Sequence, residues 1–458
     1  MIQKLLVANR GEIAVRIIRA ARELGIKTVA IYSEADKDCL HTLIADERIC
    51  IGPAASAESY LSIPNVISAC EVTGADAVHP GYGFLAENSY FADVCEACKI
   101  TFVGPSKTSM EQMGDKILAK KLAKKVGVPT VPGIEGQIAD PDDPAVLREV
   151  KRIGFPVIIK AALGGGGKGM RIVTSEEGLK VALHTAMEES KKAFGSDKVY
   201  IEKYVEEPKH IEIQVLADRK GNVVYFPERD CSIQRRHQKL VEESPSPAVD
   251  DKLRKRLGRA AMKLVEQIGY HSAGTIEFIV DKKGTFYFME MNTRIQVEHP
   301  VTEMVSGIKG RTGLDLVKEQ ILIASGEKLK FTADDVSVLG HAIECRINAE
   351  DPDKDFLPSP GRIDSIVFPG GNGIRLDTHT YGGYTIPSYY DSLVAKLIAV
   401  GSSRPKAIAK MLRALSEFRI TGIKTTIPFH RKVLQTQAFC EGEVCTNFLQ
   451  KYIYNSQG

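Results

Sequence analysis

"GTIEFIVDKKGTFYFMEMNTRIQVEHP", residues Gly274–Pro300, contains two strand-like runs joined by Asp281–Gly284, which is a hairpin signal. In its second half, polar side chains occupy every second position: Glu290, Asn292, Arg294, Gln296 and Glu298. A period of two is typical of an extended strand, whose side chains point to opposite faces in turn. The pattern therefore predicts a β-ribbon that presents carboxylates, an amide and a guanidinium on one surface.

The register of this hairpin decides whether two of its acids meet. If Val280 faces Thr285, Glu277 faces Phe288 and Glu290 falls one diagonal step away on the same face. Diagonal neighbours have Cβ atoms about 7 Å apart, so the two carboxylates can converge. Unpaired carboxylates this close repel each other, and a divalent cation would remove the conflict.

Magnesium suits this pair because it takes few carboxylates and completes its shell with phosphate oxygens and water. We therefore predict that Glu277, Glu290 and Asn292 hold Mg-ATP. The alternative is a pair of surface acids countered by lysines such as Lys282. That alternative is weakened because Glu277 stands in an apolar strand beside Phe278, where a buried acid needs a partner.

Farther along the same face, Arg294, Gln296 and Glu298 suit a small oxyanion that meets the γ-phosphate of ATP. A guanidinium can fork onto a planar oxyanion, an amide can fix a second oxygen, and a carboxylate can accept a proton. Bicarbonate is one candidate, and the residues alone leave an amino acid or another carboxylate open.

Composition indicates a globular chain of several domains. Its 458 residues exceed one ordinary core, so two or three domains are expected. Lys plus Arg (61) nearly balances Asp plus Glu (58), and the net charge of +3 gives no broad field for nucleic acid or acidic membranes. Charges also interrupt the apolar runs near the N-terminus before they reach membrane length. We expect no nucleic-acid or membrane partner.

The nine cysteines are scattered and odd in number, which argues against a disulfide framework and favours a reducing compartment. We therefore interpret the protein as cytoplasmic. Cys95 and Cys98 form a CxxC pair, but "FADVCEACKI" has helical spacing and no partner pair follows at zinc-ribbon distance. We expect them to be buried helix cysteines.

Three regions follow from the order of the apolar patterns. Residues 1–114 alternate strand and helix, with "GEIAVRIIRAARELG" closed by Gly25, which predicts an α/β domain with a parallel sheet. Residues 115–330 contain a small α+β unit at about 131–204, followed by mostly antiparallel strands around one helix. Residues 331–458 contain further strands and the helix "RPKAIAKMLRALSEF".

A glycine loop, "GGGGKGM" at Gly164–Met170, lies between two predicted strands. Four successive glycines suit a backbone that approaches a phosphate chain with its amides free. The loop is not a Walker A motif, because Gly169 follows Lys168 where Ser or Thr is required. We predict a lid over phosphates, with Lys160 supplying a charge, and the alternative is a flexible hairpin tip.

The chain resembles the biotin carboxylase component of biotin-dependent carboxylases, of the acetyl-CoA carboxylase or two-subunit pyruvate carboxylase type. The motifs that carry the resemblance span essentially the whole chain: "ANRGEIAVRIIRAARELG", "HPGYGFLAEN", "KAALGGGGKGMR", "ERDCSIQRRHQK", "EMNTRIQVEHPVTE" and "ECRINAEDP". The resemblance implies an ATP-grasp fold with an N-terminal Rossmann-like α/β domain, a small mobile lid and a C-terminal mixed α+β domain. One departure is Lys168, where arginine is common in the family.

The implied reaction uses Mg-ATP (or Mn-ATP) and bicarbonate to make carboxyphosphate, and then carboxylates biotin on a carrier. By resemblance, the residues that contact ATP are Lys116, Lys160, Gly165, Gly166, Gly167, Glu202, Lys203, Val205, His210, Gln234, His237, Glu277 and Glu290. Bicarbonate would be held by Arg294, Gln296 and Val297, and deprotonated by Glu298. Arg346 would stabilise the biotin enolate with help from Tyr82, and Lys239 would steady carboxyphosphate.

The resemblance also implies partners: a biotin carboxyl carrier protein, a carboxyltransferase subunit and a second copy of this chain in a homodimer. The final acceptor, whether acetyl-CoA, pyruvate or another compound, stays open. Two alternatives remain at this stage. One is another ATP-grasp ligase that makes carbamoyl phosphate or an amide, and the other is a catalytically silent nucleotide-binding scaffold.

Overall fold

The N-terminal unit contains the parallel sheet that the sequence predicts. The computed structural model describes residues 1–134, 136–162 and 170–454 of the chain. The sheet has the order β3-β2-β1-β4-β5, formed by Glu47–Cys50, Lys27–Tyr32, Lys4–Val7, Ala77–His79 and Thr101–Phe102. Its helices are α1 (Gly11–Glu23), α2 (Leu40–Ile44), α3 (Ile63–Thr73), α4 (Ser89–Ala97) and α5 (Lys107–Gly114). Gly25 follows α1 with φ +75°, a conformation that suits glycine after a helix end.

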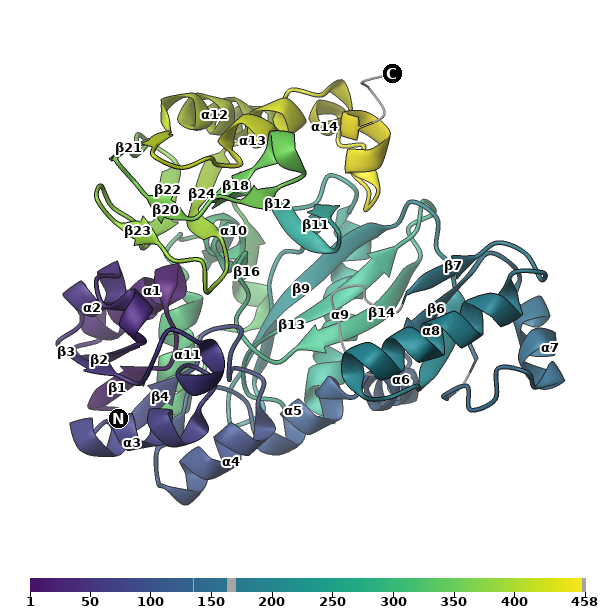
Figure 1. Ribbon diagram of the computed structural model, residues 1–458, viewed down its shortest axis with the longest axis horizontal. Helices are drawn as coiled ribbons and strands as arrows, with labels where there is room; N and C mark the ends of the chain where they lie inside the picture. The colour runs from purple at the N-terminus through teal and green to yellow at the C-terminus, as the bar shows by residue number, and fades with distance from the viewer. Residues whose placement is uncertain (135, 163–169, 455–458) are drawn as a thin grey trace.

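A small α+β unit projects from the rest of the molecule (Figure 1). It follows helix α6 (Lys116–Lys125), and its antiparallel sheet has the order β7-β6-β8, formed by Arg171–Val173, Val157–Ala161 and Val199–Lys203. Its helices are α7 (Pro144–Ile153) and α8 (Leu179–Phe194). Val146 and Val150, one helical turn apart, form the buried face of α7.

A nine-stranded sheet forms the centre of the molecule and carries most of the candidate site. Its order is β14-β13-β9-β11-β12-β17-β24-β22, with β10 paired to β9. These strands are Phe286–Asn292, Ser272–Val280, Lys209–Ala217, Arg229–Arg235, Gln238–Ser244, His341–Asn348, Leu393–Gly401, Ile374–Thr378 and Val223–Tyr225. Strand β12 pairs with β17, so the sheet continues across residue 330.

Helices cover this sheet and close its core. Helix α9 (Asp251–Gln267) packs on β9 and β10, and α12 (Arg404–Glu417) packs on β24 and β17. The other helices are α10 (His299–Val305), α11 (Leu316–Ala324), α13 (Ile427–Leu434) and α14 (Gln437–Glu441). Two-stranded pairs complete the fold: β15 (Ser306–Ile308) with β16 (Val336–Val338), β18 (Glu350–Asp351) with β19 (Leu357–Pro358), β20 (Gly361–Arg362) with β23 (Thr385–Ile386), and β21 (Ser365–Val367) with β25 (Arg419–Thr421).

The hairpin of β13 and β14 corrects the predicted register by one residue. Val280 pairs with Phe286 rather than with Thr285, because the Asp281 carboxylate accepts the backbone N–H groups of Lys283 and Thr285 and closes a longer turn. A bulge between Glu277 and Phe278 then shifts the pairing again. As a result, Glu277 lies directly opposite Glu290 instead of diagonal to it.

The predicted continuation of this strand through Glu298 is wrong. Strand β14 ends at Asn292, and Glu298 stands at the N-cap of α10. The alternation of polar residues continues beyond the strand because the turn after β14 also buries polar side chains, namely Gln296 and Glu298.

Two further expectations concern the CxxC cysteines and membrane-spanning helices. Cys95 is buried in α4, but Cys98 caps the helix end and is exposed, so the expectation of two buried cysteines holds for one of them. Within residues 1–134, 136–162 and 170–454, no helix is long and apolar enough to pass through a membrane.

Candidate active site

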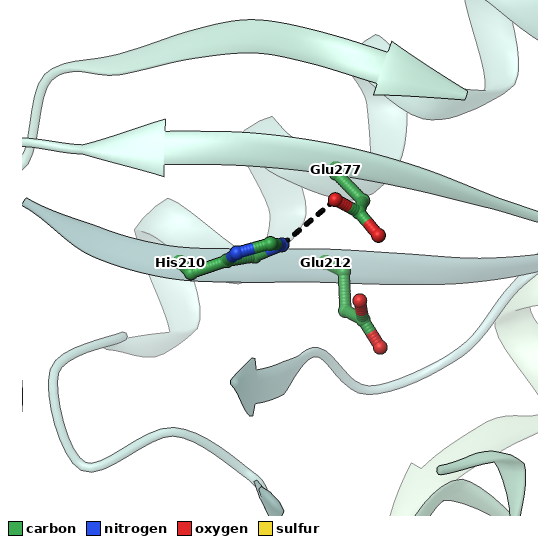
Figure 2. A group of neighbouring side chains, drawn as sticks. All are labelled: His210, Glu212 and Glu277. Atoms are coloured by element: carbon green, nitrogen blue, oxygen red, sulfur yellow. Dashed lines mark ion pairs between the residues drawn. The ribbon is translucent and has the colours of Figure 1, made fainter. Parts of the chain in front are cut away.

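Glu277 stands at the centre of a buried polar cluster on β13. Its carboxylate accepts hydrogen bonds from Lys239 Nζ (3.0 Å), Asn292 Nδ2 (2.9 Å) and Gln296 Nε2 (2.8 Å). His210 Nε2 lies 2.9 Å from its second oxygen, and Figure 2 shows this pair together with Glu212 on the neighbouring strand β9. Burial raises the pKa of Glu277, but the charges of Lys239 and His210 outweigh it and hold that pKa well below its ordinary value. Glu277 is therefore an ionised carboxylate in the interior.

Glu290 faces Glu277 across the hairpin and is less well compensated. Its carboxylate lies 3.7 Å from Lys116 Nζ, and its side chain is 35% exposed. Burial and the negative charge of Glu277 raise the pKa of Glu290 above its ordinary value. Lys282, the lysine considered as a surface partner for these acids, pairs with Glu207 instead at 2.6 Å. The two facing carboxylates thus form a donor set that a divalent cation would stabilise.

Lys239 joins three carboxylates in the middle of the site. Its Nζ lies 2.6 Å from Glu212, 3.0 Å from Glu277 and 2.7 Å from Glu298. Burial lowers the pKa of Lys239, but the three carboxylates outweigh burial and raise that pKa well above its ordinary value. The ammonium group is therefore a permanent positive charge between the Glu277 and Glu298 ends of the cluster.

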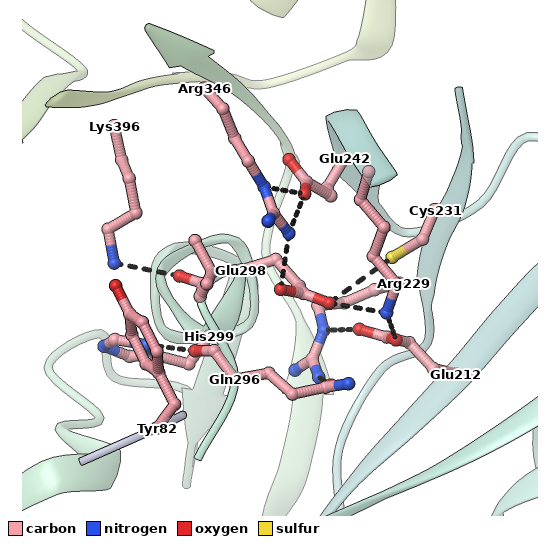
Figure 3. Close-up of polar contacts among 12 residues, drawn as sticks. Tyr82, Glu212, Arg229, Cys231, Glu242, Gln296, Glu298, His299, Arg346 and Lys396 are labelled. Carbon is pink, nitrogen blue, oxygen red and sulfur yellow. Dashed lines mark hydrogen bonds and ion pairs between the residues drawn. The ribbon is translucent and has the colours of Figure 1, made fainter. Parts of the chain in front are cut away.

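Glu298 and Arg346 form the opposite end of the cluster (Figure 3). Arg346 Nη2 lies 2.9 Å from Glu298, and Arg346 Nε donates to Glu242 at 2.6 Å. Burial raises the pKa of Glu298, yet the charges of Lys239 and Arg346 dominate and hold the pKa well below its ordinary value. Glu298 is consequently ionised, and it is a weak base while both cations face it.

Arg294 and Gln296 lie between the two ends, in the turn after β14. Arg294 Nε donates to Glu87 of the N-terminal unit at 2.8 Å, and its Nη2 donates to Asn292 Oδ1 at 3.1 Å. Gln296 donates to Glu277 and accepts from Arg229 at 2.7 Å, which fixes the orientation of its amide. The structure therefore brings together Arg294, Gln296 and Glu298 although the strand does not continue through them.

A second polar group lies at the junction of α6 with the small α+β unit. Glu202 on β8 pairs with Lys160 at 2.9 Å and with Lys120. Burial raises the pKa of Glu202, but these two lysines outweigh it and lower that pKa. A pocket of about 90 Å³ is lined by Lys120, Glu202, Tyr200 and neighbouring residues. Lys160 therefore contacts Glu202 in this structure, and its contact with a phosphate stays a prediction.

The remaining predicted residues fall around these two groups. Lys203 donates through its ammonium to the carbonyls of Gly154 and Phe155, at 3.0 and 2.8 Å. Gln234 is buried, and His237 stands in the exposed β11–β12 turn. Val205 follows β8. The Gly165, Gly166, Gly167 and Lys168 predictions lie outside the residues that the structure describes.

Comparison with known proteins assigns the chain to a family. The profile of the biotin carboxylase N-terminal domain matches residues 1–110, that of the carbamoyl-phosphate synthase L chain ATP-binding domain matches 115–332, and that of the biotin carboxylase C-terminal domain matches 344–451. Biotin carboxylase 1 of Bacillus subtilis is 57% identical over 453 residues, which cover 99% of each chain. The chain belongs to the biotin carboxylase family.

Solved structures of biotin carboxylases are similar over nearly the full length. The biotin carboxylase–β-γ-ATP complex of Campylobacter jejuni aligns with a TM-score of 0.94 and 49% identity over 99% of both chains. The biotin carboxylase domain dimer of Hydrogenobacter thermophilus 2-oxoglutarate carboxylase, solved with MgADP, ADP and bicarbonate, gives a TM-score of 0.92 and 49% identity over 98% of both chains. The ATP-grasp fold expected from the sequence is thereby confirmed.

Arg229 was not predicted from the sequence, although it is the largest fully buried side chain among the residues that the structure describes. Its guanidinium donates to Glu212, and to four further oxygens at 2.7–3.1 Å, on Gln214, Thr275, Gln296 and Thr302. Its partners come from distant parts of the chain, so no local pattern marks it.

Glu212 was also missed, although a local signal was present. In β9, His210, Glu212 and Gln214 alternate with apolar residues, and all three polar residues are buried. Polar side chains at period two in an otherwise apolar strand indicate a polar face inside the molecule. Of these three residues, only His210 was predicted as a site residue.

Proposed function

We propose that this chain carboxylates biotin held on a separate carrier protein. Bicarbonate attacks the γ-phosphorus of ATP to give carboxyphosphate and ADP, and the carboxyl group then passes to N1′ of biotin while the departing phosphate takes the N1′ proton. The observation that carries the proposal is the buried cluster in which Lys239 joins Glu277 to Glu298 while Arg346 pairs with Glu298. One end of this cluster suits a magnesium nucleotide and the other suits an oxyanion.

At the nucleotide end, Glu277, Glu290 and Asn292 would hold magnesium. The facing carboxylates and the raised pKa of Glu290, caused by burial and then by Glu277, support this assignment. When bound, the ion would neutralise charge on the ATP phosphates and on these carboxylates. The proposed ATP contacts around this centre are Lys116, Lys160, Gly165, Gly166, Gly167, Glu202, Lys203, Val205, His210, Gln234 and His237.

At the oxyanion end, Arg294, Gln296 and the Val297 N–H would hold bicarbonate, and Glu298 would take its proton. Bicarbonate is a poor nucleophile until it loses this proton, which a positioned carboxylate can accept. Lys239 and Arg346 hold the pKa of Glu298 low against the opposing effect of burial. We infer that Glu298 becomes more basic when these two cations turn toward the charges of the reacting groups.

The same two cations would act in the second step. Arg346 would stabilise the negative oxygen of the biotin enolate, because a guanidinium in a protein keeps its charge. Lys239 would steady carboxyphosphate, and Tyr82 would contact biotin. These roles place each cation of the cluster beside a charge that develops during the reaction.

The proposal extends to organisation and partners. We propose domains at 1–114, 115–330 with a lid at about 131–204, and 331–458. A carrier protein or biotinylated subunit, a carboxyltransferase subunit and a second copy of this chain are the proposed partners. The nine cysteines are thiols, which agrees with a reducing compartment and with action in the cytoplasm.

Release of ADP measured in four mixtures tests the function: ATP with magnesium alone, with bicarbonate, with free biotin, and with both. We expect release to need bicarbonate and to rise when biotin is added. An ATP-grasp ligase for another acid would need that acid instead, and a silent scaffold would bind ATP without turnover. Turnover that is indifferent to both bicarbonate and biotin would overturn the proposal.

A further inference from the structure

Lys396 is a buried cation that the proposed reaction does not use. It stands on β24, its side chain is 0% exposed, and it faces Arg346 on β17 and Asp377 on β22 in the sheet register. Its Nζ donates to the carbonyl oxygen of Val297 at 2.8 Å, and it lies 3.1 Å from Glu12 Oε1 and 3.9 Å from Asp377. A fully buried ammonium is costly unless such partners surround it, so its position is tightly defined.

Glu12 is the partner of Lys396 in the first turn of α1 and is itself buried. The oxygen that faces Lys396 also accepts a hydrogen bond from the hydroxyl of Tyr82. A hydroxyl bound to a charged acceptor is held about twice as strongly as one bound to a neutral acceptor. Glu12 therefore fixes the ring of Tyr82, the proposed biotin contact, against the N-terminal unit.

The Val297 carbonyl connects Lys396 to the other half of the site. This carbonyl belongs to the same planar peptide unit as the N–H of Glu298. The hydrogen bond from Lys396 therefore fixes the orientation of the peptide plane that precedes Glu298. The segment carries both the proposed bicarbonate contact at Val297 and the proposed base. Figure 3 shows Lys396 and the hydroxyl end of Tyr82 directed toward one another beside this segment.

We propose that Lys396 and Glu12 are positioning residues of the carboxylation site. Lys396 holds the peptide that carries Glu298, and Glu12 holds Tyr82. The continuous chain from Tyr82 through Glu12 and Lys396 to Val297 then keeps the biotin contact and the bicarbonate contacts at a fixed separation. This inference rests on the proposed function, because it assumes that these contacts bind biotin and bicarbonate.

The test compares Lys396→Met and Glu12→Gln in two assays, after the wild-type protein has been shown to need bicarbonate and to respond to biotin. Failure of the wild type in that first step would reject the proposed function rather than this inference. The first assay is bicarbonate-dependent ATP hydrolysis without biotin. The second is the same turnover titrated with free biotin.

Lys396→Met is expected to raise KM for bicarbonate about tenfold or more and to lower kcat in the first assay, because the Val297 peptide loses a charged donor. KM for ATP should stay within about twofold, since the nucleotide end is untouched. Glu12→Gln is expected to raise KM for biotin about tenfold, because Tyr82 loses its charged acceptor, and to raise KM for bicarbonate by a smaller factor, because Lys396 loses one of its charged partners. If Lys396 and Glu12 only stabilised the fold, kcat would fall in proportion to the fraction of folded protein and every KM would stay unchanged. That result would overturn the inference.

A double-mutant cycle keeps the inference testable if Lys396→Met fails to fold. Tyr82→Phe removes the hydrogen bond to Glu12 and Glu12→Gln weakens it by removing the charge of the acceptor, so their effects on KM for biotin should be non-additive when combined. Additive effects would overturn the role of Glu12. Lys396→Gln, which keeps a polar side chain but removes the charge, would then replace Lys396→Met in the bicarbonate assay. The same rise in KM for bicarbonate is expected, and an unchanged KM would overturn the inference.

Discussion

Arg346 Nη2 lies 2.9 Å from the carboxylate of Glu298, so the group proposed to stabilise the biotin enolate is paired with the group proposed to deprotonate bicarbonate. Each residue compensates the buried charge of the other, and Lys239 and Glu242 extend the pair on either side. The arrangement links the deprotonation of bicarbonate to the stabilisation of the biotin enolate. Movement of Arg346 toward biotin would remove a cation that holds the pKa of Glu298 down.

Replacing Glu298 tests the proposed base directly. Glu298→Gln keeps the size of the side chain and a hydrogen-bond acceptor but cannot take a proton. We expect biotin-dependent turnover to fall at least about a hundredfold, the lower range for loss of a general base. Binding of Mg-ATP, measured by calorimetry, should stay near the wild-type value because the nucleotide end keeps its residues.

The control for this variant is Glu96→Gln, which changes an exposed glutamate on α4 and should leave turnover unchanged. Turnover of Glu298→Gln close to that of the wild type would refute the role of the base.

The sequence predicted the acids of this site because their chemistry is local. Glu277 and Glu290 belong to one hairpin, and their spacing was enough to expect that they meet, even though the pairing at Glu277 is shifted by two residues from the predicted register. One residue of the shift comes from the Asp281 turn and the other from the bulge between Glu277 and Phe278, and both depend on backbone geometry that residue types alone do not specify. The prediction that the two acids meet does not depend on this error, because both registers place them close together.

Long-range partners could not be predicted in the same way. Arg229, Glu242 and Lys396 contact residues that lie far away in the sequence, so their pairing depends on the order of strands in the nine-stranded sheet. The end of β14 at Asn292 was missed for a related reason. Polar alternation describes which side chains are buried together, and a buried turn can produce the same period as a strand.

Arg229 should contribute strongly to stability because five oxygens depend on it. We expect Arg229→Ala to reduce the free energy of unfolding by about 3–5 kcal/mol, the range for removing one partner of a buried ion pair. Urea unfolding followed by circular dichroism measures this change. Arg148→Ala, at an exposed helix position, should change the same quantity by less than about 0.5 kcal/mol. Equal effects of the two substitutions would show that Arg229 is not a structural centre.

Glu290 should control the requirement for metal. Glu290→Gln removes one of the two facing carboxylates and leaves Glu277 with its own partners. We expect the magnesium concentration that gives half-maximal ATP binding to rise about tenfold or more, as one ligand charge is lost. Glu327→Gln changes an exposed glutamate and serves as the matched control. An unchanged magnesium requirement would mean that Glu290 is a surface acid without a metal role.

Glu344 should make stability depend on pH. Its two carboxylate oxygens are buried and have no hydrogen-bond partner among the residues that the structure describes. Burial, opposed by the charge of Lys396, raises the pKa of Glu344 well above its ordinary value. The folded protein then keeps a proton that the unfolded chain releases above the ordinary pKa. The stabilisation is complete below the ordinary pKa and is lost as pH rises toward the raised one, by about 1.4 kcal/mol for each pH unit that separates the folded and unfolded pKa values.

Glu344→Gln removes this titration while keeping a neutral side chain of similar shape. We therefore expect the variant to gain stability relative to the wild type as the pH is raised from about 5 to about 8, measured by urea unfolding at each pH. Glu71→Gln, at an exposed position on α3, should show a constant difference from the wild type over the same range. If the difference between Glu344→Gln and the wild type were also constant, Glu344 would be ionised in the folded protein. Its charge would then have to be matched by the neighbouring cations Arg346 and Lys396.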